Sequence, residues 1–298
     1  MNAKPLRSAR KALYVFLTVV MIAGFLTAFA ILAIDGVDWW RARVVRQEVQ
    51  QLYQPSGSLD LWDVLFASAL ASAQPQPSDS PWQDESPANE SQEIQEDFRA
   101  LYERNPDVIG WLTAGESIGL PVVQRDNEYY LSHNFFGELD SNGTVFLNEM
   151  NVLSPRDHVL LVHGHNMRSG EMFGKLTQYE DEAYMRQHPL ISFRAVYEEQ
   201  ASYYVPIACF NASMIAHASG YFDVRPVHFA TEEACQDYLD EVLGRSYWSA
   251  PAEVAPQDEL LLLLTCSYQH EDGRFLLFCR KLRDDETAEQ MQSLYQPS

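Results

Sequence analysis

Hydrophobic positions divide the chain into three parts. Residues 12–34 are 23 consecutive uncharged and mainly apolar positions, which as a helix would extend about 34 Å at ~1.5 Å per residue. Residues 35–97 are mostly polar. From residue 98 onward, short apolar runs rich in β-branched and aromatic residues alternate with turn signals. Such a pattern is typical of a membrane-spanning helix, a stalk and a folded β domain.

The last part predicts the fold class. Its strand-like runs are "LPVVQ", "GTVFLN", "HVLLVHG", "ISFRAVYE", "ASYYVPIACF", "LLLLLTC" and "RFLLFCRKL". A helical stretch over 98–112 is broken at Asn105–Pro106. Two more helical segments, 169–189 and 231–246, interrupt the strands, and Thr231 is the expected N-cap of the second. The sequence therefore predicts a mainly β domain, a barrel or a sandwich, with inserted helices.

The flanks of the apolar segment predict its orientation. Basic side chains precede it and acidic and aromatic ones follow it: Lys4, Arg7, Arg10 and Lys11, then Asp35, Asp38, Trp39 and Trp40. By the positive-inside rule, residues 1–11 are cytoplasmic, and everything after about residue 40 is extracellular. A cleaved signal peptide ending at "AFA" is the alternative, but 12–34 is longer than the usual apolar region of such peptides.

The segment before the β domain has the composition of a solvated linker. Residues 51–97 carry nine acidic residues and no Lys or Arg, and the Pro, Ser and Gln around them disfavour a core, so 35–97 is predicted to be an acidic stalk. A short helix over 59–70 could form within it. The folded domain is expected at 98–283, followed by a tail at 284–298.

Charge and cysteine content exclude several classes of protein. A net charge of −21, from 42 acidic and 21 basic residues, excludes a general phosphate-binding surface and hence nucleic acid as partner. Four cysteines without a CxxC pair are too few and too scattered for a disulfide scaffold or a zinc knot. One or two bridges are possible and none is required.

Candidate chemistry begins with Cys266, which follows five leucines, and Arg274, which follows the turn signal Asp272–Gly273. A hairpin there would place the two side chains next to each other. Taken singly, Cys266 could be a buried core thiol and Arg274 a solvated turn residue. Together they suit acyl transfer, because a cation lowers the pKa of a thiol and a guanidinium can hold an oxyanion.

A third candidate is the histidine pair His163 and His165, at the end of the apolar strand in "HVLLVHGHNMRSGEMF". His163 and His165 share a face of a strand, so either could approach the thiol. We favour His165, because it lies next to the loop that follows. A metal site formed by both histidines and Cys266 would lack a fourth ligand, so no metal is expected.

Four blocks of the chain resemble class B sortases. They are "NPDVIGWL", "LPVVQRDNEYYLSHNFFGELDSNGTVFLN", "LLVHGHNMRSGEMFGKL" and "LLTCSYQHEDGRFLLFCRKL", in the order of that family and within residues 98–283. The resemblance implies an eight-stranded sortase β-barrel with additional helices. It also implies a cysteine transpeptidase, without metal or organic cofactor, held by its N-terminal helix on the outer surface of a Gram-positive-type cell.

The resemblance also assigns roles to residues. Cys266 corresponds to the nucleophile, which attacks a threonine carbonyl in the C-terminal sorting motif of a secreted protein. His165 corresponds to the acid/base residue and Arg274 to the oxyanion donor. The thioacyl group passes to an amine of a peptidoglycan precursor of the lipid II type. The substrate groove would be lined by Asn127, Leu131, Tyr238 and Leu239.

Two positions depart from the family pattern, and two rival functions stay open. His163 stands where the family usually has Tyr, and Leu264 stands where a Ser often precedes "TC", which puts one substrate hydrogen bond in doubt. A sortase that polymerises pilin subunits would differ in its acceptor, a lysine of a protein. A noncatalytic extracellular interaction module would instead have Cys266 in a disulfide with Cys209, Cys235 or Cys279.

Overall fold

The computed structural model describes residues 5–53, 93–267 and 272–296. The chain divides into two compact units, Met1–Val44 and Val45–Ser298. Helix α1 (Pro5–Leu52) makes up the described part of the first unit and begins the second. The short helix predicted at 59–70 and most of the predicted stalk lie outside the described residues.

Over the described residues, no helix combines the length and the apolarity that crossing a membrane requires. The predicted span, 12–34, lies within α1, but the side chains of residues 12, 13, 15 and 30–34 are outside the described set.

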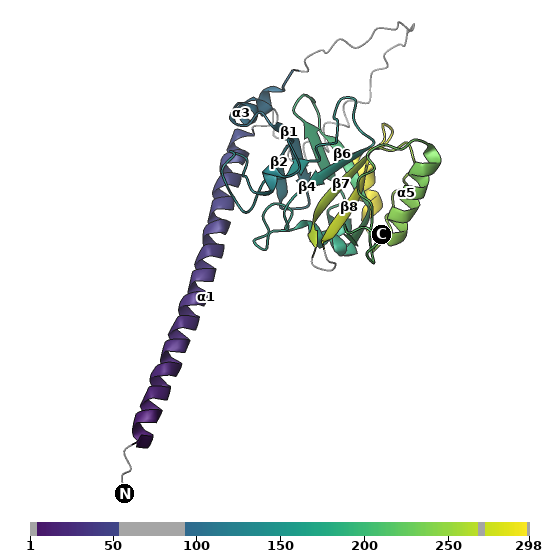
Figure 1. Cartoon of the computed structure of the whole chain (residues 1–298). Helices are drawn as coiled ribbons and strands as arrows, with labels where there is room; N and C mark the ends of the chain where they lie inside the picture. The colour runs from purple at the N-terminus through teal and green to yellow at the C-terminus, as the bar shows by residue number, and fades with distance from the viewer. Residues whose placement is uncertain (1–4, 54–92, 268–271, 297–298) are drawn as a thin grey trace, which may run out of the picture. The chain divides into compact units, whose positions relative to one another are not determined.

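The second unit is a closed eight-stranded barrel, which confirms the barrel alternative (Figure 1). In chain order its strands are β1 (Val108–Ala114), β2 (Ile118–Val123), β3 (Phe146–Leu147), β4 (Val159–His163), β5 (Ile191–Ala195), β6 (Ser202–Ser213), β7 (Leu260–Ser267) and β8 (Gly273–Lys281). They are hydrogen-bonded in the order β1-β2-β3-β4-β7-β8-β6-β5. Pairs β2–β3 and β4–β7 are parallel and the others antiparallel, so the sheet is mixed.

Helices and short 3-10 turns cover the barrel. They are α3 (Glu96–Arg104), η1 (Tyr129–Leu131), η2 (Leu176–Glu180), α4 (Glu182–Gln187), α5 (Glu232–Arg245) and α6 (Ala288–Tyr295). Alternate β7 residues face opposite ways, as strand geometry requires. Leu261 and Leu263 pack inside the barrel, whereas Leu260, Leu262 and Leu264 pack in the cluster that includes α5. The five-leucine run is thus buried on both faces.

Two sequence predictions fail in part. The helical stretch predicted over 98–112 is helical only as far as Arg104, and after Pro106 the chain becomes β1, between β2 and β5. Of the predicted helix 169–189, only η2 and α4 form. Tertiary pairing decides the first case, because closing the barrel needs a strand there. The predicted tail contains α6, whose Tyr295 is fully buried and donates to the Pro206 carbonyl at 2.6 Å.

Thr231 caps α5, as predicted: its hydroxyl accepts from the Ala234 amide at 3.2 Å. We expect Thr231→Ala to lower the free energy of unfolding by about 1 kcal/mol, since it leaves that amide without its partner. Thr231→Ser keeps the hydroxyl and should keep the stability. Urea titrations of the two variants test this, and equal midpoints would show that the cap contributes nothing.

Candidate active site

Cys266 and Arg274 lie directly opposite each other on β7 and β8. The Cys266 side chain is partly exposed, whereas Cys209, Cys235 and Cys279 are buried. Nη1 of Arg274 contacts the Asp272 carboxylate at 2.8 Å and donates to the Gly273 carbonyl at 3.0 Å. The hairpin predicted from Asp272–Gly273 therefore brings the thiol and the guanidinium to one end of the barrel.

His165 reaches the same end because β4 runs parallel to β7. The register pairs Val159 with Leu260 and continues to His163 with Leu264. Two residues further along the chain come His165, just past the end of β4, and Cys266, still within β7. Side chains two positions apart share a face, so the register brings the imidazole to the thiol, close enough for each group to shift the pKa of the other.

Three further hydrogen bonds fix the His165 loop to β7. The Gly164 amide donates to the Leu264 carbonyl at 3.1 Å, and the Thr265 hydroxyl donates to the Gly164 carbonyl at 2.7 Å. The Asn166 amide group donates to the Cys266 carbonyl at 2.8 Å. Sequence reasoning did not select Thr265 or Asn166 as site residues. Both are adjacent to the candidates in "TC" and "GHN", and that adjacency was the available signal.

The imidazole of His165 has its other contact with backbone. Its Nε2 lies 2.7 Å from the Leu131 carbonyl oxygen, which accepts from it. Leu131 was predicted to line a substrate groove through its side chain, which is 44% exposed. The hydrogen bond that its carbonyl accepts from His165 is a second role. A backbone contact of this kind leaves no signal in the sequence. This contact orients the ring and leaves Nδ1 for the thiol.

The environment favours the charged forms of both partners. The hydrogen bond to His165 lowers the pKa of the Cys266 thiol below its usual value, the charge of Arg274 lowers it further, and burial and Asp272 oppose the shift. The same hydrogen bond raises the pKa of His165, with help from the Leu131 carbonyl and against burial and Arg274. A thiolate beside an imidazolium is a competent nucleophile with a proton donor within reach.

His163, the alternative histidine, has a different environment. The Asn148 side chain donates to its Nε2 at 3.2 Å, and its ring stacks on Phe146 with centroids 4.9 Å apart. Burial, with a smaller effect of Arg274, lowers the pKa of His163 to about 4. His163 is therefore neutral at physiological pH and cannot supply a proton as an imidazolium.

The other predicted groove residues lie in different surroundings. Asn127 bridges to Glu149, donating to its carboxylate at 3.2 Å and accepting from its amide at 2.9 Å. Tyr238 and Leu239 lie on α5, and both are buried in the cluster beneath that helix. Leu239 is fully buried. Substrate contact by these three residues stays a prediction.

The described residues also bear on the two alternatives for Cys266. All four cysteines lie in described segments and are free thiols. Across the same segments, no group of three or more His, Cys, Asp or Glu side chains is arranged to hold a metal ion. Among the described residues, the thiol of Cys266 therefore has neither a disulfide partner nor a set of metal ligands around it.

Comparisons with known proteins identify relatives in sequence and in fold. No family model matches the chain. Sortase B of Listeria monocytogenes is 28% identical over 209 residues, covering 65% of this chain and 77% of the relative, and sortase B of Staphylococcus aureus is 25% identical over 194 residues, covering 64% and 76%. The chain is a homologue of sortase B.

Solved sortase B structures share the fold. Sortase B from B. anthracis, in complex with AAEK1, superposes with a TM-score of 0.62 at 22% identity and covers 83% of this chain and 99% of that one. The S. aureus sortase B–substrate complex gives a TM-score of 0.58 at 22% identity, covering 64% and 87%. The sortase-type barrel predicted from the sequence is thereby confirmed.

Proposed function

We propose that the chain is a cysteine transpeptidase of the sortase B type. The observation that carries the proposal is the convergence at one end of the barrel of Cys266 on β7, Arg274 on β8 and His165 just after β4, where His165 and Cys266 shift each other's pKa. Homology to sortase B supports the same conclusion.

The reaction follows from these side chains. The Cys266 thiolate attacks the backbone carbonyl of the threonine in a sorting motif near the C-terminus of a secreted protein, and Arg274 donates to the resulting oxyanion. His165 gives its proton to the leaving amine as the C–N bond breaks, which leaves a thioacyl enzyme. An amine of a lipid II-type peptidoglycan precursor then attacks the thioester carbonyl, neutral His165 takes its proton, and the C–S bond breaks to return the Cys266 thiolate. The S. aureus relative was solved as a substrate complex, which supports a sorting peptide as substrate.

The test is incubation of the full-length protein with a panel of fluorogenic sorting peptides, with and without an amine acceptor. The proposal predicts cleavage of one motif class and, with acceptor, a product in which the acceptor amine is joined to the motif's threonine. Cleavage of none of the motifs, under conditions where a known sortase B cleaves them, would refute it.

The proposal includes the location of the enzyme. A membrane anchor at 12–34, with residues 1–11 cytoplasmic and the barrel outside the cell, is supported by the apolar run and by the basic residues before it. The stalk at 35–97 and the catalytic domain at 98–283 complete this organisation. The protein should remain in membranes after alkaline carbonate extraction and be digested by protease added to intact cells. Release by carbonate would exclude the anchor.

Arg274 should contribute less than the nucleophile but far more than a solvated turn residue. Loss of one oxyanion donor costs about 10²–10³-fold in turnover, so Arg274→Ala should lower kcat/KM for the peptide by that factor. Arg274→Lys should restore only part of the activity, since an ammonium lacks the guanidinium fork. Unchanged kcat/KM in Arg274→Ala would remove the oxyanion role.

A further inference from the structure

Arg46, near the C-terminal end of α1, is tied to the barrel by a partly buried ion pair. Its Nη1 lies 3.0 Å from Oε2 of Glu171, and its Nη2 donates to the Ser117 carbonyl. The side chains of Arg46 and Glu171 are 21% and 10% exposed. The pair joins positions 125 residues apart, and all of these residues belong to the Val45–Ser298 unit.

Glu171 belongs to the loop that carries His165. The Phe173 amide donates to the His165 carbonyl at 2.9 Å, and Asn166 pairs with Met172 as an isolated bridge. A Cβ added at Gly164 would lie 2.7 Å from the Phe173 ring, so the loop closes tightly on itself. His165 is at one end of this closed loop and Glu171 at the other. Displacement of Glu171 therefore displaces the frame that holds the imidazole.

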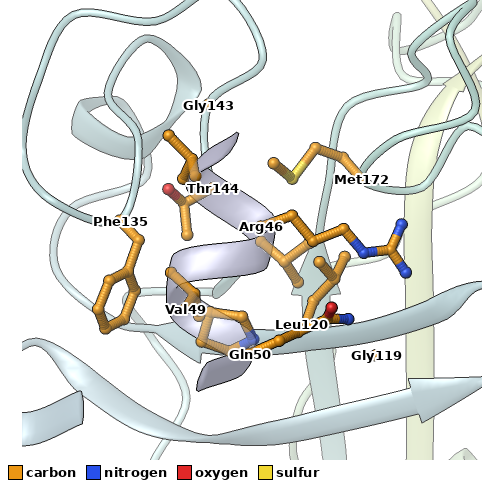
Figure 2. Close-up of a pocket in the computed structure, with 12 residues that line it drawn as sticks. Arg46, Val49, Gln50, Gly119, Leu120, Phe135, Gly143, Thr144 and Met172 are labelled. Carbon is orange, nitrogen blue, oxygen red and sulfur yellow. The ribbon is translucent and has the colours of Figure 1, made fainter. Parts of the chain in front are cut away.

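A pocket lies beside the ion pair. Arg46, Val49 and Gln50 of α1 line it together with Leu120, Gly143 and Met172 (Figure 2). Its empty volume is about 350 Å³, part of which is open solvent at its mouth. Gly143, with φ of +60°, also approaches the imidazole, since a Cβ there would lie 3.0 Å from Cδ2 of His165. Side chains therefore fill only part of the space between the end of α1 and the barrel, and this space adjoins Gly143, the neighbour of His165.

We propose that the Arg46–Glu171 ion pair positions His165 for catalysis. This proposal rests on the proposed function, and it makes the end of α1 part of the structure that supports the active site. Arg46 and Glu171 do not touch the substrate and act through the loop. A charge-assisted hydrogen bond between partly buried groups holds its geometry better than an exposed pair. A displacement of a catalytic group by about 1 Å can cost as much as ~10²-fold in rate.

Charge reversal in the full-length protein, purified in detergent micelles, tests this proposal. Arg46→Glu and Glu171→Arg should each lower kcat for the sorting peptide about tenfold with a smaller change in KM, a size typical of couplings between residues outside the site. The double variant should exceed both single variants in kcat. Recovery should be partial, because glutamate cannot donate to the Ser117 carbonyl. Glu171→Gln is a milder change and should lower kcat about threefold. It provides the test if either charge reversal prevents folding.

A second measurement does not depend on peptide cleavage. Because Cys266 is the partly exposed cysteine and the other three are buried, iodoacetamide reports on its pKa. Each single reversal should raise the pH midpoint of alkylation by weakening the hydrogen bond from His165, and the double variant should lower it again. This pattern in a protein that cleaves no sorting peptide would support the positioning contact and refute the proposed function alone.

The matched control is the exposed ion pair Arg104–Glu48, which links α3 to the same part of α1. Nη2 of Arg104 lies 3.2 Å from Oε1 of Glu48. Arg104→Glu and Glu48→Arg should change kcat by less than about twofold, as expected for exposed ion pairs. The proposal is overturned if these controls lose as much activity as the Arg46 and Glu171 variants. It is equally overturned if the losses at Arg46 and Glu171 simply multiply in the double variant, with no shift of the alkylation midpoint.

Discussion

Cys266→Ala should reduce peptide cleavage by about four orders of magnitude or more, to a rate set by binding alone. Alanine cannot form the thioacyl bond, and none of the other three cysteines can replace it. Those thiols are buried, and burial raises the pKa of Cys209 to about 12 and that of Cys279 well above its usual value. Steady-state kinetics on the peptide identified from the panel measure the effect.

Cys279→Ala is the matched control, because Cys279 is a free thiol buried inside the barrel, on β8 but towards the opposite end of that strand from Arg274. It should fold and keep its activity within a few fold. If Cys279→Ala abolished cleavage as completely as Cys266→Ala, the loss would reflect the fold. If Cys266→Ala kept its activity, the nucleophile would be elsewhere.

His165→Ala should have the next largest effect, a fall in kcat/KM of about 10²–10⁴-fold, the range for loss of a general acid–base group. It should also change the pH dependence of the thiol. The hydrogen bond to His165 is the largest cause of the lowered pKa of Cys266, and burial acts in the opposite direction. Without the imidazole, the pKa of the thiol rises, so the thiolate fraction near pH 7 falls. Alkylation rates measured from pH 5 to 10 should therefore show a midpoint displaced upward.

The other histidine supplies the control. His163→Tyr introduces the residue that class B sortases usually have at this position and leaves the His165 loop in place. Because His163 is already neutral near pH 7, the substitution removes no proton donor, and the alkylation midpoint should stay close to that of the unaltered protein. An upward displacement in His163→Tyr but not in His165→Ala would exchange the roles of the two histidines.

Local sequence signals predicted much of this fold. Alternating apolar runs gave the strands, Thr231 gave the start of α5, and Asp272–Gly273 gave the hairpin that aligns Cys266 with Arg274. Each of these signals depends on residues only a few positions apart. The stretch after Pro106 was misassigned because its neighbours β2 and β5, rather than its own propensity, decide that it is a strand.

Contacts between distant segments could not be predicted in the same way. The parallel pairing of β4 with β7 brings His165 to Cys266, and no local pattern specifies which strand lies next to which. The Leu131 carbonyl on the imidazole is a backbone contact, which any residue type could make. Likewise, Arg46 and Glu171 are separately ordinary charged residues, and only the folded chain shows that they meet.

The central claim is that Cys266 forms the covalent intermediate in a site shared with His165 and Arg274. Its most direct test is mass spectrometry of the full-length protein quenched in acid during turnover of a sorting peptide, followed by peptide mapping. The account predicts an added mass equal to the acyl part of the peptide, carried by Cys266, released by hydroxylamine and absent from Cys266→Ala. Turnover without such an adduct, or with the adduct on another residue, would contradict it.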